Sequence, residues 1–222
     1  MSTAETRSAP GAAAAPARKG ASWKAFALRQ FIQWHWISAA ISLVGMILFA
    51  VTGITLNHAA DISTEPVVRE QSVTLPQAML DELDAAPARD RQPLPPAVSA
   101  WMQQTLSVTS AGHEAEWSDD EVYLAIARPG GNSVISIDRA SGEVAFEDTW
   151  RGWIAYLNDL HKGRDTGVYW SWFIDIFAGA CVLFCVTGLG LLWLKAPARP
   201  STWPLIGLGV IVPLLLAVFL IH

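Results

Sequence analysis

Charged residues are scarce in this chain, and cysteines are scarcer. Of 222 residues, 16% are charged and two are cysteines. Three long stretches, residues 36–56, 168–194 and 203–221, contain one charged side chain between them, that of Asp175. Such runs exclude an ordinary soluble globular domain as the whole of the chain. Both cysteines lie inside the second stretch, so they cannot form the disulfide framework of an external domain.

Short motifs of several common chemistries are also absent. The chain has no CxxCH, which excludes covalent attachment of a c-type haem. It has no GxGxxG and no GxxxxGKS/T, which nucleotide-binding loops use, and no HExxH, which zinc proteases use. The sequence therefore predicts neither nucleotide-dependent chemistry nor a zincin site.

Apolar residues make up 52% of the chain instead. Each apolar stretch is long enough to cross a hydrocarbon layer of about 30 Å as a helix, and a helix satisfies its own backbone hydrogen bonds there. The first stretch is too long, and begins too far along the chain, for a cleaved signal peptide. The sequence thus predicts three transmembrane helices in a lipid bilayer.

Basic residues are distributed asymmetrically around these helices. Five Lys or Arg, against one Glu, precede the first helix, and Lys195 and Arg199 lie in the short loop after the second. Because basic residues favour the cytoplasmic side, we expect a cytoplasmic N-terminus and an external segment between the first two helices. In a bacterium, this segment would lie in the periplasm. The Ala- and Pro-rich residues 1–30 are expected to form a disordered tail.

The external segment, residues 59–167, has the length of one small domain. "LPQAMLDELDAA" and "PAVSAWMQQTLS" predict two short helices, and "EVYLAIARP" and "NSVISID" alternate as half-buried strands do. Asp138 and Gly142 bound a tight hairpin turn, with Gly142 at positive φ. "TWRGWIAYLNDLHKG" predicts a helix at the membrane surface. The segment contains eighteen acidic residues and eight basic ones. Its net negative charge repels nucleic acid and favours cationic partners or metal complexes. The alternative is that the charge serves solubility alone.

One short pattern, F-x-V-T-G, occurs twice, at residues 49–53 and 184–188. The two helices are expected to run in opposite directions, so the copies would form an inverted pair near different membrane faces. Each threonine can bond back to its own helix, and each glycine leaves room for close approach or for a ring. The alternative is a coincidence of two common packing elements.

Three of the five histidines lie at ends of membrane helices. His35 stands at the cytoplasmic end of the first helix, on a face of small and hydroxylated side chains. His58 follows after 23 residues, or about 34 Å of helix, and His161 precedes the second helix, also at the outer face. Two imidazoles at one membrane surface suit the axial positions of an electron-transferring haem b. The alternatives are independent interfacial histidines and, for His35, helix packing. His113 and His222 are expected to be ordinary surface residues.

Three segments carry a family likeness: "WHWISAAISLVGMILFAVTGITLNH", "LHKGRDTGVYWSWFIDIFAGACVLFCVTGLGLLW" and "VISIDRASGEV". They resemble the PepSY-associated transmembrane-helix family. The resemblance implies an integral membrane α-helical fold with an external α+β PepSY-like domain between helices 1 and 2. It also implies haem b, with His35, His58 and His161 as ligands of haem iron, and electron transfer outward, often to ferric siderophores in iron uptake.

Two departures from that family affect the interpretation. Larger members have at least four membrane helices and histidines for two haems, whereas this chain has His35 alone on the cytoplasmic side. A second haem there would take a ligand from the other copy in a homodimer. "DRASGEV" also departs from the covalent-flavin acceptor pattern, because Glu143 and Val144 replace small residues, so an ordinary hairpin is expected.

The first hypothesis is therefore an inner-membrane haem b electron-transfer protein, acting as a membrane reductase or its electron-transfer subunit toward a periplasmic electron acceptor or metal complex. A non-redox, membrane-tethered PepSY binding or assembly module and a metal-uptake accessory protein are the alternatives. The expected segments are a cytoplasmic tail (1–30), helix 1 (31–58), the periplasmic domain (59–167), helix 2 (168–194), a cytoplasmic loop (195–202) and helix 3 (203–222).

Overall fold

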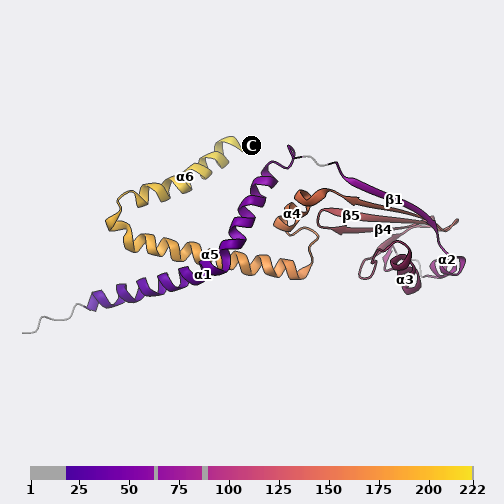
Figure 1. Cartoon of the computed structure of the whole chain (residues 1–222), viewed down its shortest axis with the longest axis horizontal. Helices are drawn as coiled ribbons and strands as arrows, with labels where there is room; N and C mark the ends of the chain where they lie inside the picture. The colour runs from indigo at the N-terminus through magenta and orange to yellow at the C-terminus, as the bar shows by residue number, and fades with distance from the viewer. Residues whose placement is uncertain (1–18, 63–64, 87–89, 222) are drawn as a thin grey trace, which may run out of the picture. The chain divides into compact units, whose positions relative to one another are not determined.

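The computed structural model describes residues 19–62, 65–86 and 90–221 (Figure 1). Within these ranges, three helical spans are long and apolar enough to cross a membrane: Trp23–Asn57, Val168–Ala198 and Thr202–Leu220. The strands of the described chain form a six-stranded sheet. In chain order the elements are α1 (Lys19–Asn57), β1 (Val67–Thr74), α2 (Gln77–Asp84), β2 (Arg91–Gln92), α3 (Pro96–Thr105), β3 (Ala115–Trp117), β4 (Glu121–Arg128), β5 (Gly131–Asp138), β6 (Glu143–Trp150), α4 (Gly152–Lys162), α5 (Val168–Lys195), the 3-10 helix η1 (Ala196–Ala198) and α6 (Thr202–Leu220).

The chain divides into two compact units, which are described separately. The first, Leu43–Ala178, holds the sheet with α2, α3 and α4, together with the last part of α1 and the first part of α5. The second holds the residues up to Ser42 and those from Gly179 onward, and so contains the rest of α1 and α5 together with α6. Both long helices therefore contribute to both units.

The sheet is antiparallel, with the strand order β1-β6-β5-β4-β3-β2. The turn between β5 and β6 forms because the Asp138 carboxylate accepts hydrogen bonds from the backbone N–H groups of Ala140 and Ser141. Gly142 follows with a φ of 71°, a conformation that costs glycine little. The predicted hairpin turn, with glycine at positive φ, is confirmed.

One face of the sheet is covered by α2 and α3 (Figure 1). Strands β4 and β6 begin with alternating exposed and buried side chains, and β5 alternates buried with half-buried ones, as strands with one covered face do. The core between helices and sheet is formed by Leu80, Leu83, Val98, Met102, Val122, Leu124, Ile135, Ile137, Val144 and Phe146, together with the residues around them. The two helices and the two alternating strands predicted for this segment are confirmed as α2, α3, β4 and β5.

Asp159 joins α4 to the sheet. Its side chain is 5% exposed and accepts hydrogen bonds from the backbone N–H of Gly130, in the β4–β5 turn, and from the Arg151 guanidinium. The helix ends at Gly163, which has a left-handed φ of 66°, as is common at helix C-termini. The helix predicted for this segment is thus present, and it carries His161 in its last turn. Its place at the membrane surface stays a prediction.

The N-terminal region differs from the expectation. α1 begins at Lys19, so residues 19–30, which composition assigned to a disordered tail, are helical. The prolines of this region end at Pro16, and the residues that follow are mostly Ala, Lys, Leu, Arg and Gln, which favour helix. The expected tail at residues 1–18, and His222 at the other end, lie outside the described residues.

Strand β1 has no clear signal in the sequence. Its centre is charged or polar, and most of its side chains are exposed, so apolar alternation is weak. It is held instead by pairing along its whole length with β6, from Val67 opposite Trp150 to Thr74 opposite Glu143. Charged side chains are typical of an edge strand, where they discourage pairing with other chains.

Candidate functional site

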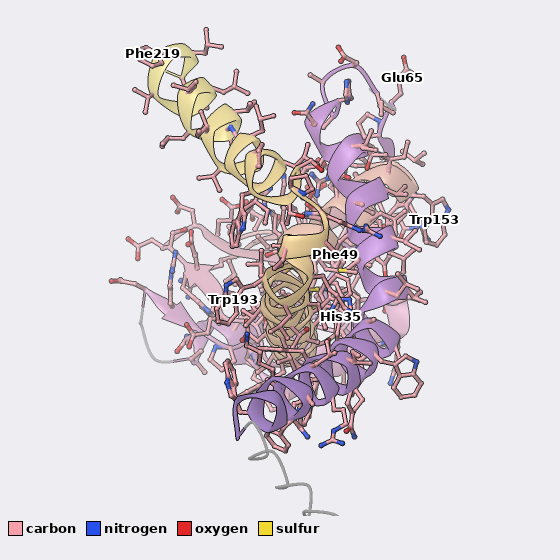
Figure 2. The ribbon with its side chains drawn as sticks, turned by 90° about the vertical axis from the view of Figure 1, so that its left-hand side faces the viewer. His35, Phe49, Glu65, Trp153, Trp193 and Phe219 are labelled. Carbon is pink, nitrogen blue, oxygen red and sulfur yellow. The ribbon has the colours of Figure 1, made fainter. Side chains whose placement is uncertain are left out.

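His35 lies on α1 (Figure 2), and α5 holds its half-buried imidazole. The Nδ1 atom is 3.1 Å from Oγ1 of Thr187 and 3.1 Å from the backbone oxygen of Phe184. The ring also stacks on the ring of Phe184, with centroids 4.4 Å apart and planes 18° from parallel. All of these contacts come from the second copy of the F-x-V-T-G pattern.

His161 is held in the same way by the first copy of that pattern. Its Nδ1 atom is 2.7 Å from Oγ1 of Thr52, on α1. The ring lies against that of Phe49, with centroids 4.8 Å apart. We call the two arrangements the His35 cradle, formed by Phe184, Thr187 and Gly188, and the His161 cradle, formed by Phe49, Thr52 and Gly53.

The threonines decide which way these hydrogen bonds run. Thr187 and Thr52 each donate the hydroxyl proton to the carbonyl four residues earlier in their own helix, at 2.7 and 2.9 Å. A hydroxyl has one proton to give, and while that proton is donated to the helix, the oxygen can only accept from the imidazole. In that arrangement Nδ1 of His35 and of His161 carries the proton, and Nε2 of the neutral ring has a bare lone pair. For His35, the Phe184 carbonyl, which can only accept, favours the same tautomer.

The glycine of each pattern lies against an imidazole. Room for a ring was one of the two roles that the sequence suggested for these glycines. A Cβ added at Gly188 would lie 3.2 Å from Cε1 of His35, which is tighter than ordinary packing. A Cβ added at Gly53 would lie 3.6 Å from Cε1 of His161, an ordinary van der Waals distance. An added side chain would thus press on the imidazole in the His35 cradle and not in the His161 cradle.

Rings and glycines also meet beyond the cradles. A Cβ at Gly190 would collide with the ring of Phe31, in the same unit as His35, and one at Gly45 would collide with the ring of Phe177, in the same unit as His161. Within each unit, later residues of one helix therefore contact earlier residues of the other. The helices cross in opposite directions, as the inverted-pair interpretation requires.

His58 follows the last residue of α1 and is exposed. Its Nδ1 atom is 3.0 Å from the backbone oxygen of Ile54, which can only accept, so its Nε2 is also bare in the neutral ring. Within the described part of the chain, His58 and His161 share no hydrogen bond or ring contact: His161 contacts Thr52, and His58 contacts the Ile54 carbonyl.

The other polar candidates make no hydrogen bond with the cradle histidines in the described part of the chain. His113 lies between α3 and β3. Asp175 is exposed on α5, and Cys181 and Cys185 are free thiols on the same helix. Cys185 follows Phe184 and lines the same cavity as His35. No cluster of three or more His, Cys, Asp or Glu side chains suited to a metal ion occurs in residues 19–62, 65–86 and 90–221.

Sequence analysis missed a cavity of about 940 Å³ beside His35. Side chains of α5 supply most of its wall, and Lys195, Arg199 and Thr202 supply polar groups. Cavities of this size, mostly apolar with a few polar groups, are typical of small-molecule and cofactor sites. The spacing of His35 from Lys195 in the sequence gave no signal, because the cavity depends on how the helices cross.

A second, smaller cavity of about 330 Å³ lies beside α4. Arg151, Lys162 and Arg164 line it, together with apolar residues from the end of α1 and the segment after it. Arg151 is paired with Asp159. The basic lining contrasts with the acidic composition of the segment as a whole. The overall count of charged residues therefore gave no sign of this basic cavity.

These features define a membrane protein in which apolar helices are combined with a six-stranded antiparallel sheet. The chain belongs to the PepSY_TM-like family, whose model matches residues 26–222. This confirms the resemblance to a PepSY-associated transmembrane family. No curated protein matches the chain, and no solved structure does.

Proposed function

We propose that this chain is a haem b electron-transfer protein of the bacterial inner membrane that passes electrons to a periplasmic acceptor. One observation carries the proposal: His35, His58 and His161 each direct Nδ1 to an oxygen of the protein, which leaves Nε2 bare in the neutral ring. Histidines that ligate metals through one nitrogen almost always donate the other N–H to such an acceptor. The donor set therefore fits the cofactor that the family resemblance implies.

Within this proposal, the three imidazoles would hold the haem iron, and the protein fixes their orientation. Haem b, when bound, supplies a reversible one-electron couple of iron, and two imidazoles favour electron transfer over oxygen binding. His161 is the better positioned of the outer candidates, because Thr52 and Phe49 hold both its Nδ1 atom and its ring.

His58 is the second outer candidate. Two nitrogens that bind one iron lie about 4 Å apart, which is twice a metal–nitrogen bond of about 2 Å. Nδ1 of His58 contacts the Ile54 carbonyl, and Nδ1 of His161 contacts Thr52. His58 would hold the same iron as His161 where the two Nε2 atoms come within that distance; otherwise the second ligand would come from another copy of the chain.

The cavity beside His35 supports a second cofactor site. Its apolar wall suits a porphyrin ring, and Lys195 and Arg199 suit the carboxylates of its propionates. With His35 as one ligand, a homodimer would supply the other.

The acceptor and the orientation follow from charge. The positive-inside rule places the N-terminus and the loop with Lys195 and Arg199 in the cytoplasm, and the sheet in the periplasm. The acidic composition of residues 59–167 suits a cationic partner or a metal complex. Reduction of ferric siderophores in iron uptake is the role that agrees best with the family resemblance.

The experiment is haem analysis of the purified full chain and four single variants. The wild type should show a Soret band that shifts on reduction with dithionite. His161→Ala should lose haem or become high-spin, because a ligand of the iron would be gone, and His58→Ala should do the same if both imidazoles bind one iron. His35→Ala should reduce the haem-to-protein ratio and leave the outer spectrum unchanged. His113→Ala is the matched control and should equal the wild type.

A colourless wild-type protein would contradict the proposal. So would equal haem content in the wild type, His35→Ala and His161→Ala. Either result would leave a non-redox, membrane-tethered binding module or a metal-uptake accessory as the better function.

A further inference from the structure

The threonines of the repeated pattern do more than pack the helices. We propose that Thr52 and Thr187 are positioning residues that hold His161 and His35 as the Nδ1–H tautomer, and that the two F-x-V-T-G segments are equivalent devices for this task. The tautomer assignment stands without any cofactor. Its consequence for haem rests on the proposed function.

The spacing of the pattern explains why one short segment can do this. Residues three and four apart lie on one face of a helix. Phenylalanine, threonine and glycine at relative positions 0, 3 and 4 therefore present a ring, a hydroxyl and a gap to the same neighbour. In both cradles that neighbour is an imidazole, with ring centroids at 4.4 and 4.8 Å and Nδ1 at 3.1 and 2.7 Å from the hydroxyl oxygen.

The hydrogen bond from each threonine to its own helix contributes to this positioning. A freely rotating hydroxyl could donate to Nδ1 and so stabilise the opposite tautomer. Thr52 and Thr187 each have a main-chain carbonyl within donating distance, at 2.9 and 2.7 Å, and a hydroxyl that donates there leaves its oxygen as an acceptor for Nδ1. Back-bonding of this kind is common for threonine in membrane helices.

The two cradles differ in the number of hydrogen-bond partners of Nδ1. Nδ1 of His35 has a second acceptor, the Phe184 carbonyl at 3.1 Å. For Nδ1 of His161, Thr52 is the one hydrogen-bond partner within the described part of the chain. Removal of the threonine oxygen should therefore affect His161 more than His35.

The first measurement uses the haem-free full chain in detergent, with histidine labelled by ¹⁵N. Ring nitrogen shifts distinguish the two neutral tautomers, and the signals are assigned by single His→Ala variants. His35 and His161 should both report a protonated Nδ1. Thr52→Val, which has the same shape but no oxygen, should shift His161 toward a tautomer mixture, and Thr52→Ser should restore the wild-type signal. Thr187→Val should shift His35 by less.

Thr55→Val is the control, since Thr55 lies one turn along α1 and bonds Asn158 rather than a histidine. It should leave the His161 signal unchanged. An unchanged His161 signal in Thr52→Val, or an Nε2–H tautomer in the wild type, would overturn the proposal whether or not the protein binds haem.

The second measurement tests the consequence for bound haem by redox titration and haem titration. Without the acceptor, the imidazole donates less charge to iron, so ferric haem is less stabilised and the midpoint potential should rise in Thr52→Val. Haem affinity should fall by about 10–100-fold, as is typical when a partner of a metal-ligating histidine is removed. A haem protein with unchanged potential and affinity in Thr52→Val would overturn the positioning role and leave the electron-transfer function standing. A protein that binds no haem would overturn that function and leave the tautomer result to decide the positioning role.

Discussion

At the scale of residues, Gly53 and Gly188 occupy the same position in the two copies of the pattern, yet the space beside them differs. The imidazole of His35 lies so close to Gly188 that a methyl group there would force it to move, whereas Gly53 has room for one beside His161. Because helix positions otherwise favour alanine over glycine by up to about 1 kcal/mol, the two substitutions should have opposite effects.

Gly188→Ala is expected to displace the His35 ring and to weaken its bond to Thr187, since the added Cβ lies 3.2 Å from Cε1. It should lower thermal stability and change the His35 ring-nitrogen signals. Gly53→Ala is its natural counterpart and should leave the His161 signals and the melting temperature unchanged or slightly raised. Equal disturbance by both substitutions would count against the difference between the cradles.

At the scale of elements, Asp148 links three neighbouring strands. On β6, its carboxylate accepts hydrogen bonds from Ser133 on β5, at 2.6 Å, and from Arg128 on β4, at 2.7 Å. Partial burial by itself raises the pKa of Asp148, but the hydrogen bonds from Ser133 and Arg128, with the positive charge of Arg128, outweigh it and lower the pKa below its ordinary value of 3.8. The ionised form is thus the one that the folded sheet stabilises.

The sign of the pH dependence follows directly. A carboxylate whose pKa is lower in the folded state contributes its full stabilisation above the unfolded pKa, and loses it as the pH falls through the folded pKa. Asp148→Asn should therefore destabilise the sheet at neutral pH, and its difference from the wild type should shrink as the pH falls below about 4. Thermal unfolding of the full chain, followed by circular dichroism across this range, measures the effect. Glu70→Gln, on exposed β1, is the control, and a pH-independent difference for Asp148→Asn would contradict the explanation.

Local sequence patterns predicted some of these elements and missed others. Alternation predicted β4 and β5, and Pro-initiated apolar segments predicted α2 and α3, because each pattern reports which face of a short segment is buried. β1 was missed, since an edge strand that pairs with β6 about 75 residues away is stabilised by main-chain hydrogen bonds that its own side chains do not reveal.

At the scale of the whole molecule, the family match covers residues 26–222, and so includes the sheet and all three apolar helices of the described chain. The orientation of these helices can be tested with reporter fusions. Alkaline phosphatase fused after Asp165 is expected to be active, since this position lies outside in the proposed topology, and fused after Ala198 it should be inactive. The reverse result would place His58 and His161 on the cytoplasmic side and would exclude electron transfer to a periplasmic acceptor.

The sequence by itself determined the three apolar helices, the short helices and hairpin of the sheet unit, and the placement of His58 and His161 at helix ends. Each of these depends on the order of residues within one segment, where periodicity and length are sufficient. The expected position of His35 at a helix end was wrong, because α1 begins at Lys19 and His35 lies well inside it. The sequence also revealed the repeated F-x-V-T-G pattern, whose glycines could serve close approach or leave room for a ring.

Only the tertiary structure decided which ring lies there and what holds it. His35 meets Thr187 across 152 residues, and His161 meets Thr52 across 109, and no local pattern encodes such distances. Contacts of this kind depend on how the helices cross, which is a property of packing between distant segments rather than of any one of them.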